Sequence, residues 1–132
     1  MRFLLIIAAA AIAIPAATSA REAVGFCNKY RQTESDAGSC DGCTLTVISS
    51  TTDMAYLIRA NNGWSAGAGW DHGPDAAQGV GMWDEGAPDG FDLAVFDAFF
   101  SLKEDDGLEM IMTMRDPKVF PEPIVARYAC AD

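Results

Sequence analysis

From Thr44 onward the chain consists of short apolar segments that are separated by glycine, asparagine and aspartate. Such segments, rich in Val, Ile, Leu, Tyr and Trp and bounded by turn-forming residues, are typical of the strands of an all-β protein. Short consecutive strands bury their apolar faces by closing into a barrel or by packing as two sheets. The sequence therefore predicts a small antiparallel β-barrel or a two-sheet β-sandwich of about seven strands.

Two turns and one ambiguous segment shape this prediction. Asn61-Asn62-Gly63 and Asp106-Gly107 suit tight hairpins, because Asn, Asp and Gly tolerate positive φ. Residues 92–103 also fit a helical period, but their aromatic residues and the Asp-Gly turn that follows favour a strand. The predicted strands are Thr44–Ser49, Met54–Ala60, Trp64–Trp70, Gly79–Trp83, Phe91–Leu102, Leu108–Met114 and Ile124–Cys130.

The N-terminus has a different character. Arg2 is followed by the apolar run Phe3–Ile14, then Pro15, and small residues end this leader at Ala20. This is the pattern of a secretory signal peptide, and the run is shorter than the about 20 residues that span a bilayer. We expect residues 1–20 to be removed, leaving a single exported domain, 21–132, in the periplasm or outside the cell. Residues 21–43 are predicted to form an irregular or short-helical arm.

The acidic composition limits the partners. Without Arg2, eight basic and nineteen acidic residues remain, a net charge of −11. Nucleic-acid binding requires basic side chains to neutralise phosphates, so we expect no nucleic-acid partner. No second long apolar run follows the leader, so we expect no membrane insertion of the mature chain. The partner classes that remain are an unknown protein, a glycan or a small-molecule ligand.

Four cysteines, Cys27, Cys40, Cys43 and Cys130, lie after the leader. An even number in a short exported chain indicates two disulfides. Cys43 opens the first predicted strand and Cys130 closes the last, so a Cys43–Cys130 bond would form if these strands were antiparallel neighbours. This favours Cys43–Cys130 with Cys27–Cys40. The competing pattern is Cys40–Cys43 with Cys27–Cys130.

Motifs for metals and redox cofactors are incomplete. Cys40-Asp41-Gly42-Cys43 has redox spacing but lacks the βαβ context of that motif, and no second pair completes a zinc site. The acidic run 84–92 lacks the D-x-D-x-D-G register of a calcium loop. We therefore expect no cofactor and no metal.

One segment resembles a hydrolase motif by its pattern alone. Gly63–Gly67 fits G-x-S-x-G with Ser65 as the nucleophile, and His72 is the only histidine. The motif requires a strand-to-helix turn, whereas this segment alternates like a strand and no helical pattern follows. We expect no catalytic residues, and a small hydrolase using Ser65 and His72 is kept as an alternative.

Tryptophans dominate the middle of the chain. In Trp64–Trp70 the two tryptophans share one face with two alanines, and core packing is the usual role of such a face. If that face is open, the rings form a platform for a ligand. The leading hypothesis is an exported non-catalytic binding module, inhibitor-like or ligand-binding. Its expected rim consists of Trp64, Trp70, His72, Trp83 and Asp84.

A structural envelope or surface component is the third hypothesis. Such a protein would need no ligand site and would instead show an extended exposed apolar patch through which it assembles.

Cleavage of the leader is directly testable. We expect the exported protein to have lost residues 1–20, because the leader has the charge, apolar core and small terminal residues that signal peptidases require. Intact-mass measurement of the exported protein checks this. A soluble exported form that retains residues 1–20 would contradict the signal-peptide interpretation.

Overall fold

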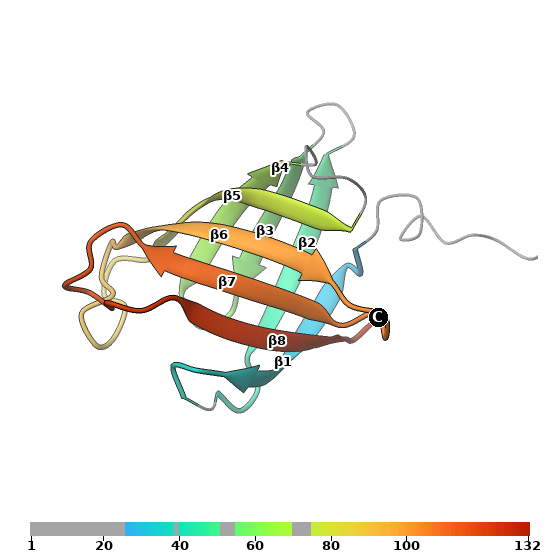
Figure 1. The fold of residues 1–132 in the computed structure, drawn as a ribbon, viewed down its shortest axis with the longest axis horizontal. Coiled ribbons are helices and arrows are strands. Elements are labelled where there is room, and N and C mark those ends of the chain that lie inside the picture. Colours follow the sequence, from blue (N-terminus) through green and yellow to red (C-terminus); the bar gives the residue numbers. More distant parts are fainter. Residues whose placement is uncertain (1–25, 39, 51–54, 70–74) are drawn as a thin grey trace, which may run out of the picture.

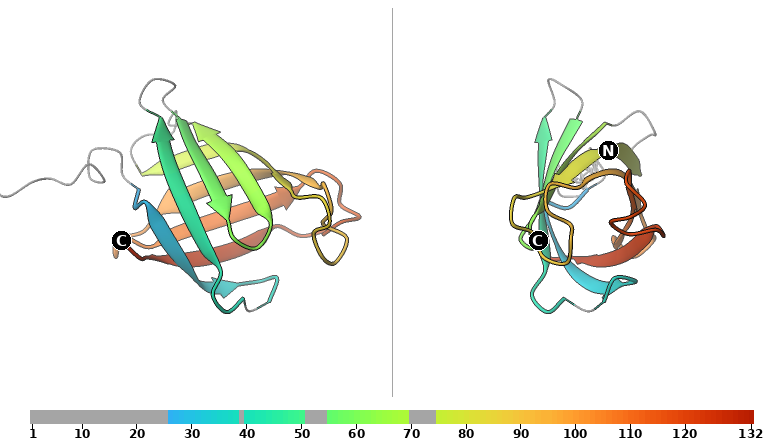
Figure 2. Two further views of the ribbon diagram at one scale, coloured as in Figure 1. Left: turned by 180° about the vertical axis from the view of Figure 1, so that it is seen from behind. Right: turned by 90° about the vertical axis from the view of Figure 1, so that its left-hand side faces the viewer.

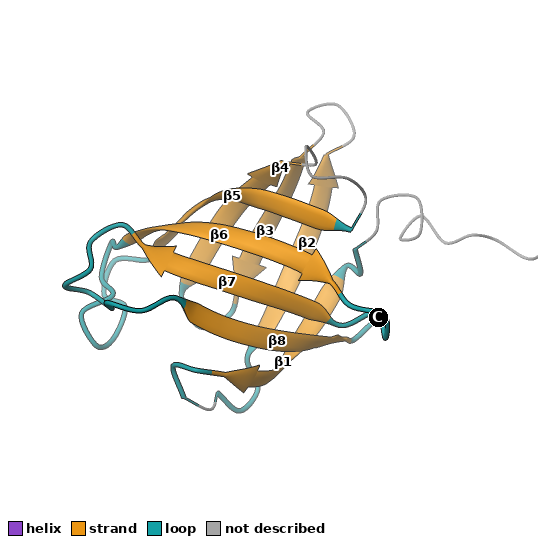
Figure 3. Cartoon of the chain, in the orientation of Figure 1, coloured by secondary structure: helices purple, strands orange, loops and turns teal. Residues whose placement is uncertain are grey.

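The computed structural model describes residues 26–38, 40–50, 55–69 and 75–132, so the predicted leader lies outside the described residues. Each strand pairs antiparallel with the next, and the last pairs with the first, which closes an up-and-down barrel (Figures 1 and 3). This confirms the predicted all-β barrel, with one strand more than expected. The strands are β1 Lys29–Ser35, β2 Thr44–Ser50, β3 Ala55–Ala60, β4 Trp64–Gly69, β5 Ala76–Trp83, β6 Val95–Leu102, β7 Leu108–Met114 and β8 Ile124–Cys130.

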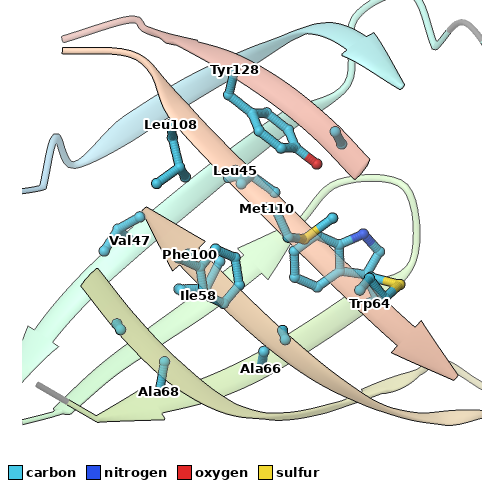
Figure 4. Packing of buried hydrophobic residues seen from close by; sticks show 14 of the residues in the cluster. Leu45, Val47, Ile58, Trp64, Ala66, Ala68, Phe100, Leu108, Met110 and Tyr128 are labelled. Atoms are coloured by element: carbon cyan, nitrogen blue, oxygen red, sulfur yellow. The ribbon is translucent and has the colours of Figure 1, made fainter. Parts of the chain in front are cut away.

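The barrel interior follows from strict alternation along the strands. In β7, the even-numbered residues Leu108, Met110, Met112 and Met114 are buried, while the residues between them are not. In β4 the tryptophan and both alanines are likewise buried. Because side chains alternate across a strand, these residues share the inner face. Figure 4 shows residues of these strands meeting in one interior cluster. No helix within the described ranges has the length and apolar character needed to cross a membrane.

Residues 29–35 of the predicted N-terminal arm form a strand, so the prediction of an irregular or short-helical arm was wrong for this part of it. The segment KYRQTES forms β1, and only Tyr30 of it is buried. This strand has no apolar alternation of its own, because its outer face is polar and Gln32 is only half-buried. Pairing with β2 and β8 stabilises it instead. Residues 91–94, predicted as strand, form turns before β6, which begins at Val95.

The disulfide pairing favoured by the sequence was also wrong. The structure joins Cys27 to Cys130, with their Cα atoms 5.9 Å apart, and Cys40 to Cys43, with their Cα atoms 5.5 Å apart. The physical reason is the extra strand. Tyr30 of β1 pairs with β2 on one side and with Cys130 of β8 on the other, so β1 separates Cys43 from Cys130.

Two glycines of β5, Gly79 and Gly81, allow β5 to approach β4 closely and the sheet to bend there. A Cβ atom on Gly79 would overlap the backbone of Gly67, and one on Gly81 would overlap the ring of Phe96. Glycine in a strand permits this close approach and the accompanying bend. In Figure 1, β2, β3 and β4 form one wall, and β5 to β8 cross it as the opposite wall. The Asn61-Asn62-Gly63 turn between β3 and β4 is as predicted, with a φ of 108° at Gly63.

One end of the barrel is filled by the segment that precedes β1. Phe26 is buried, and its ring lies edge-on to Tyr56 of β3 with the ring centroids 4.7 Å apart. The backbone N–H of Cys27 donates to the Tyr30 hydroxyl over 2.8 Å. The Cys27–Cys130 disulfide holds this segment against the end of β8.

The close approach of β4 and β5 predicts different effects for two glycine substitutions. Gly79→Ala should lower the free energy of unfolding by about 1–3 kcal/mol, because the new methyl group overlaps the β4 backbone. Gly67→Ala on the neighbouring strand is the matched control, since nothing lies within 4 Å of its Cβ position. Urea unfolding of both variants measures the difference. Equal stability of the two would contradict the described packing.

The two disulfides should contribute unequally. The loop-closure model assigns about 4.7 kcal/mol to a bond across 103 residues and about 2 kcal/mol to one across 3 residues. We therefore expect the Cys27→Ala/Cys130→Ala double variant to unfold at a much lower urea concentration than Cys40→Ala/Cys43→Ala. A larger loss in the second variant would contradict this pairing.

Candidate binding site

A cavity of about 260 Å³ opens at the end of the barrel opposite the Phe26 segment. The β1–β2, β3–β4, β5–β6 and β7–β8 connections all lie at this end, because the strands run alternately up and down. The right-hand view of Figure 2 looks toward it from the side of the β5–β6 and β7–β8 loops. The residues that line the cavity include the apolar and aromatic side chains of Trp64, Trp83, Phe91, Met110, Met112 and Tyr128, and the polar side chains of Gln32, Asn62 and Asp89.

Two tryptophans form one wall of the cavity. Trp64 and Trp83 are direct cross-strand partners at the ends of β4 and β5. Their side chains are 3% and 8% exposed. Trp64 lies edge-on to Phe96 at 5.6 Å between ring centroids, so its ring is held by the core. The tryptophans therefore pack like core residues and line the cavity at the same time.

Phe91 reaches the cavity from the β5–β6 loop. Its N–H donates to the carbonyl of Pro88 over 3.1 Å, and its own carbonyl accepts from Ala94 over 2.8 Å. Its ring lies 4.7 Å from that of Trp83 and 6.2 Å from that of Phe120 in the β7–β8 loop. This aromatic row connects the two loops at the mouth, so the opening is shaped by packed rings.

Tyr128 of β8 closes the inner side of the cavity. Figure 4 shows its hydroxyl directed into the interior, toward Met110 and Trp64. Burial raises the pKa of Tyr128 well above its ordinary value of 10.0. The hydroxyl therefore stays neutral at physiological pH and can both donate and accept a hydrogen bond.

Trp83 carries an unsatisfied polar atom. Its Nε1 is buried, and it is the one buried side-chain nitrogen or oxygen of the described chain that has no hydrogen-bond partner. An indole nitrogen can only donate. Leaving a buried donor unpaired costs about 1–3 kcal/mol, so an orphan of this kind in a native structure requires an explanation.

The loops around the mouth are strongly acidic. Residues 36–43, 61–63, 84–94 and 115–123 contain eight carboxylates and two basic side chains. All eight carboxylate residues are exposed. Their field acts on anything that enters, because exposed charges interact over about 8–10 Å at ordinary salt. The residues are Asp36, Asp41, Asp84, Glu85, Asp89, Asp92, Asp116 and Glu122, against Arg115 and Lys118.

The structure brings together part of the predicted rim. Trp64 and Trp83 meet in the cavity wall, and Asp84 follows at the exposed mouth, where its N–H donates to the Gly63 carbonyl over 2.8 Å. Trp70 and His72 lie outside the described residues, so their membership of one rim stays a prediction.

Ser65 does not line the cavity. It lies between Trp64 and Ala66 on β4, and both of these point inward, so Ser65 faces the outside of the barrel. Of the potential metal ligands in the described chain, one group comes close together: Cys27, Cys130 and Asp132. Both sulfurs of that group belong to a disulfide and offer no thiolate.

Several cavity residues were not part of the rim predicted from the sequence. Alternation does place Met110, Met112 and Tyr128 on inner faces, but it does not say which end of the barrel is open. Phe91 was assigned to a strand, whereas the loop that contains it brings its ring to the mouth.

The fold and site thus define a disulfide-linked, eight-stranded up-and-down barrel with an aromatic cavity at one end. Comparison of the chain with models of known protein families, with curated proteins and with solved structures found no match.

Proposed function

We propose that this chain is an exported, non-catalytic binding protein that holds a small, largely apolar ligand in the open end of its barrel. The observation that carries the proposal is the cavity of about 260 Å³, lined by Trp64, Trp83, Phe91 and Tyr128. Ligand sites are mostly concave and apolar, with a few placed polar groups. The interior of an eight-stranded barrel is wide enough to hold one small ligand.

A small molecule fits this site better than a protein or a glycan. Trp64 and Trp83 line the cavity and are almost fully buried, so they do not form an open platform for a flat partner surface. An apolar cavity of about 150 Å³ already accommodates benzene, so a one-ring molecule fits here. The two disulfides agree with an oxidising, exported environment.

The hydrolase alternative lacks support from the cavity. A nucleophile must lie where the substrate binds, and Ser65 is on the opposite face of β4 from Trp64. Binding without chemistry is therefore the better account of this site.

One observation favours the hypothesis of an envelope or surface component. The outer face of β2, β3 and β5 exposes Ile48, Leu57, Val80 and Met82, which are 38–48% accessible. Ile48 pairs with Leu57, and Gly67 of β4 lies between Leu57 and Val80, which makes one apolar row across the wall. Exposed apolar rows of this kind support assembly with other molecules.

A titration with ethylbenzene separates these functions. We expect the NMR signals of the cavity-lining residues to shift in ¹⁵N-labelled exported protein, and those of the outer row to stay unchanged. Ala126→Leu should weaken binding about tenfold or abolish it, because Ala126 lines the cavity and the larger side chain occupies ligand space. Ser65→Ala, on the outer face, is the matched control and should bind normally.

Two results would contradict the proposal. One is the absence of binding, or binding that Ala126→Leu leaves intact. The other is a set of shifts confined to Ile48, Leu57, Val80 and Met82, which would favour the envelope component.

A further inference from the structure

The inner wall of the cavity carries one open polar group, which narrows the class of ligand; this inference rests on the proposed function. Tyr128 is 4% exposed, and Figure 4 shows its hydroxyl directed into the interior. The hydroxyl has no hydrogen-bond partner among the described residues, yet unlike Trp83 Nε1 it is not closed off from water. A molecule in the cavity can therefore reach it, and a neutral phenol both donates and accepts.

The hydroxyl and the charged residue of the cavity lie at different depths. Tyr128 pairs with Leu108, the first residue of β7, so its backbone lies toward the closed end of the barrel. Asp89 belongs to the β5–β6 loop at the open end. Apolar side chains such as Met110 and Met112 line the space between the two ends. An occupant that uses both ends therefore needs an apolar body with a polar group on either side.

The charge at the open end has one sign. Among the described residues that line the cavity, Asp89 alone is charged, and its carboxylate makes no hydrogen bond or ion pair within the described chain. The mouth loops add seven exposed carboxylates and only two basic side chains. One of these bases, Arg115, is already paired with Asp97 over 3.0 Å. A cationic group at the mouth is therefore attracted, and an anionic group is repelled.

We propose that the cavity binds small organic cations whose apolar, one-ring-sized body carries an ammonium group at one end and a hydroxyl or carbonyl oxygen at the other. The ammonium group lies at the mouth beside Asp89, where it keeps part of its hydration because Asp89 is exposed. The oxygen pairs with the Tyr128 hydroxyl at the inner end. Asp89 thus selects the charge of the ligand, and Tyr128 selects a polar group at its inner end.

Four probes of similar shape separate the two contacts. Tyramine carries the ammonium group and a phenolic hydroxyl, p-ethylphenol lacks the charge, ethylbenzene lacks both groups, and phloretate carries a carboxylate in place of the ammonium group. Their affinities for the exported protein are measured by NMR titration at low salt. The quantity compared between variants is the ratio of two affinities, because the hydration of each free probe is the same in every titration and cancels.

Asp89→Asn tests the charged contact. Asparagine tolerates the positive φ of 58° at this position, so the loop keeps its backbone. We expect the ratio of tyramine to p-ethylphenol affinity to fall about 2- to 5-fold, the range of one exposed ion pair. Glu104→Gln removes the same charge from the β6–β7 turn at the opposite end of the barrel and is the matched control. An equal effect of the two substitutions would overturn the assignment of Asp89.

Tyr128→Phe tests the inner contact, and it removes a hydroxyl on which no hydrogen bond of the described chain depends. We expect the ratio of p-ethylphenol to ethylbenzene affinity to fall about 2- to 10-fold, the range for one hydrogen bond. The ratio of tyramine to p-ethylphenol should stay as in wild type, because both probes carry the hydroxyl. Asp89→Asn should leave the p-ethylphenol to ethylbenzene ratio unchanged, so each variant serves as a control for the other.

A third readout uses the wild-type protein alone. Tyramine should bind at least about tenfold more tightly than phloretate at low salt, because the potential of the mouth acts on the two charges in opposite directions. About 1 M salt should bring the two affinities closer, since the Debye length falls to about 3 Å. Phloretate as the tighter probe, or a preference that salt leaves unchanged, would overturn the selection by charge.

Failure of this inference is distinguishable from failure of the proposed function. If ethylbenzene shifts the signals of the cavity residues but either ratio is unchanged in its variant, the barrel binds small ligands and the proposed ligand class is wrong, because it requires both contacts. If none of the four probes shifts these signals, both the ligand class and the proposed function are wrong.

Discussion

The pairing of β1 with β8 is the contact on which the barrel depends. Tyr30 pairs with Leu45 of β2 on one side and with Cys130 of β8 on the other, and the Cys27–Cys130 disulfide lies beside this junction. Without it, β2 and β8 would both be open edges, and the interior would face water. The closed interior and the cavity at its end exist only because this short, polar strand is held in place.

Small and large residues divide the interior into a filled part and an open part. Where β4 and β5 approach each other, Ala66, Ala68, Gly79 and Gly81 leave room for the Phe96 ring and for close backbone contact. At the ends of the same two strands, the tryptophans are too large for such contact and form a wall instead. The cavity therefore begins where the small residues stop, since an eight-stranded barrel has space for side chains or for one small ligand.

The sequence predicts the barrel better than it predicts the site. Short apolar segments between turn residues identify seven strands, and alternation shows which residues of Trp64–Trp70 and Leu108–Met114 share a face, because side chains alternate along a strand. This pattern misses β1, whose stability comes from neighbouring backbones, and this omission also led to the wrong disulfide pairing. Trp64 and Trp83 were identified because tryptophan is conspicuous near turns. Phe91 and Tyr128 join them through loop conformation and strand order, which no local pattern encodes.

The buried, unpaired Nε1–H of Trp83 lowers the stability of the barrel. Replacing the indole by a hydrocarbon ring would remove the unpaired group and leave the aromatic packing on Phe91 in place. The cavity at the open end, lined by Trp64, Trp83, Phe91 and Tyr128, is the observation that identifies this end of the barrel as a site, and the unpaired donor is not.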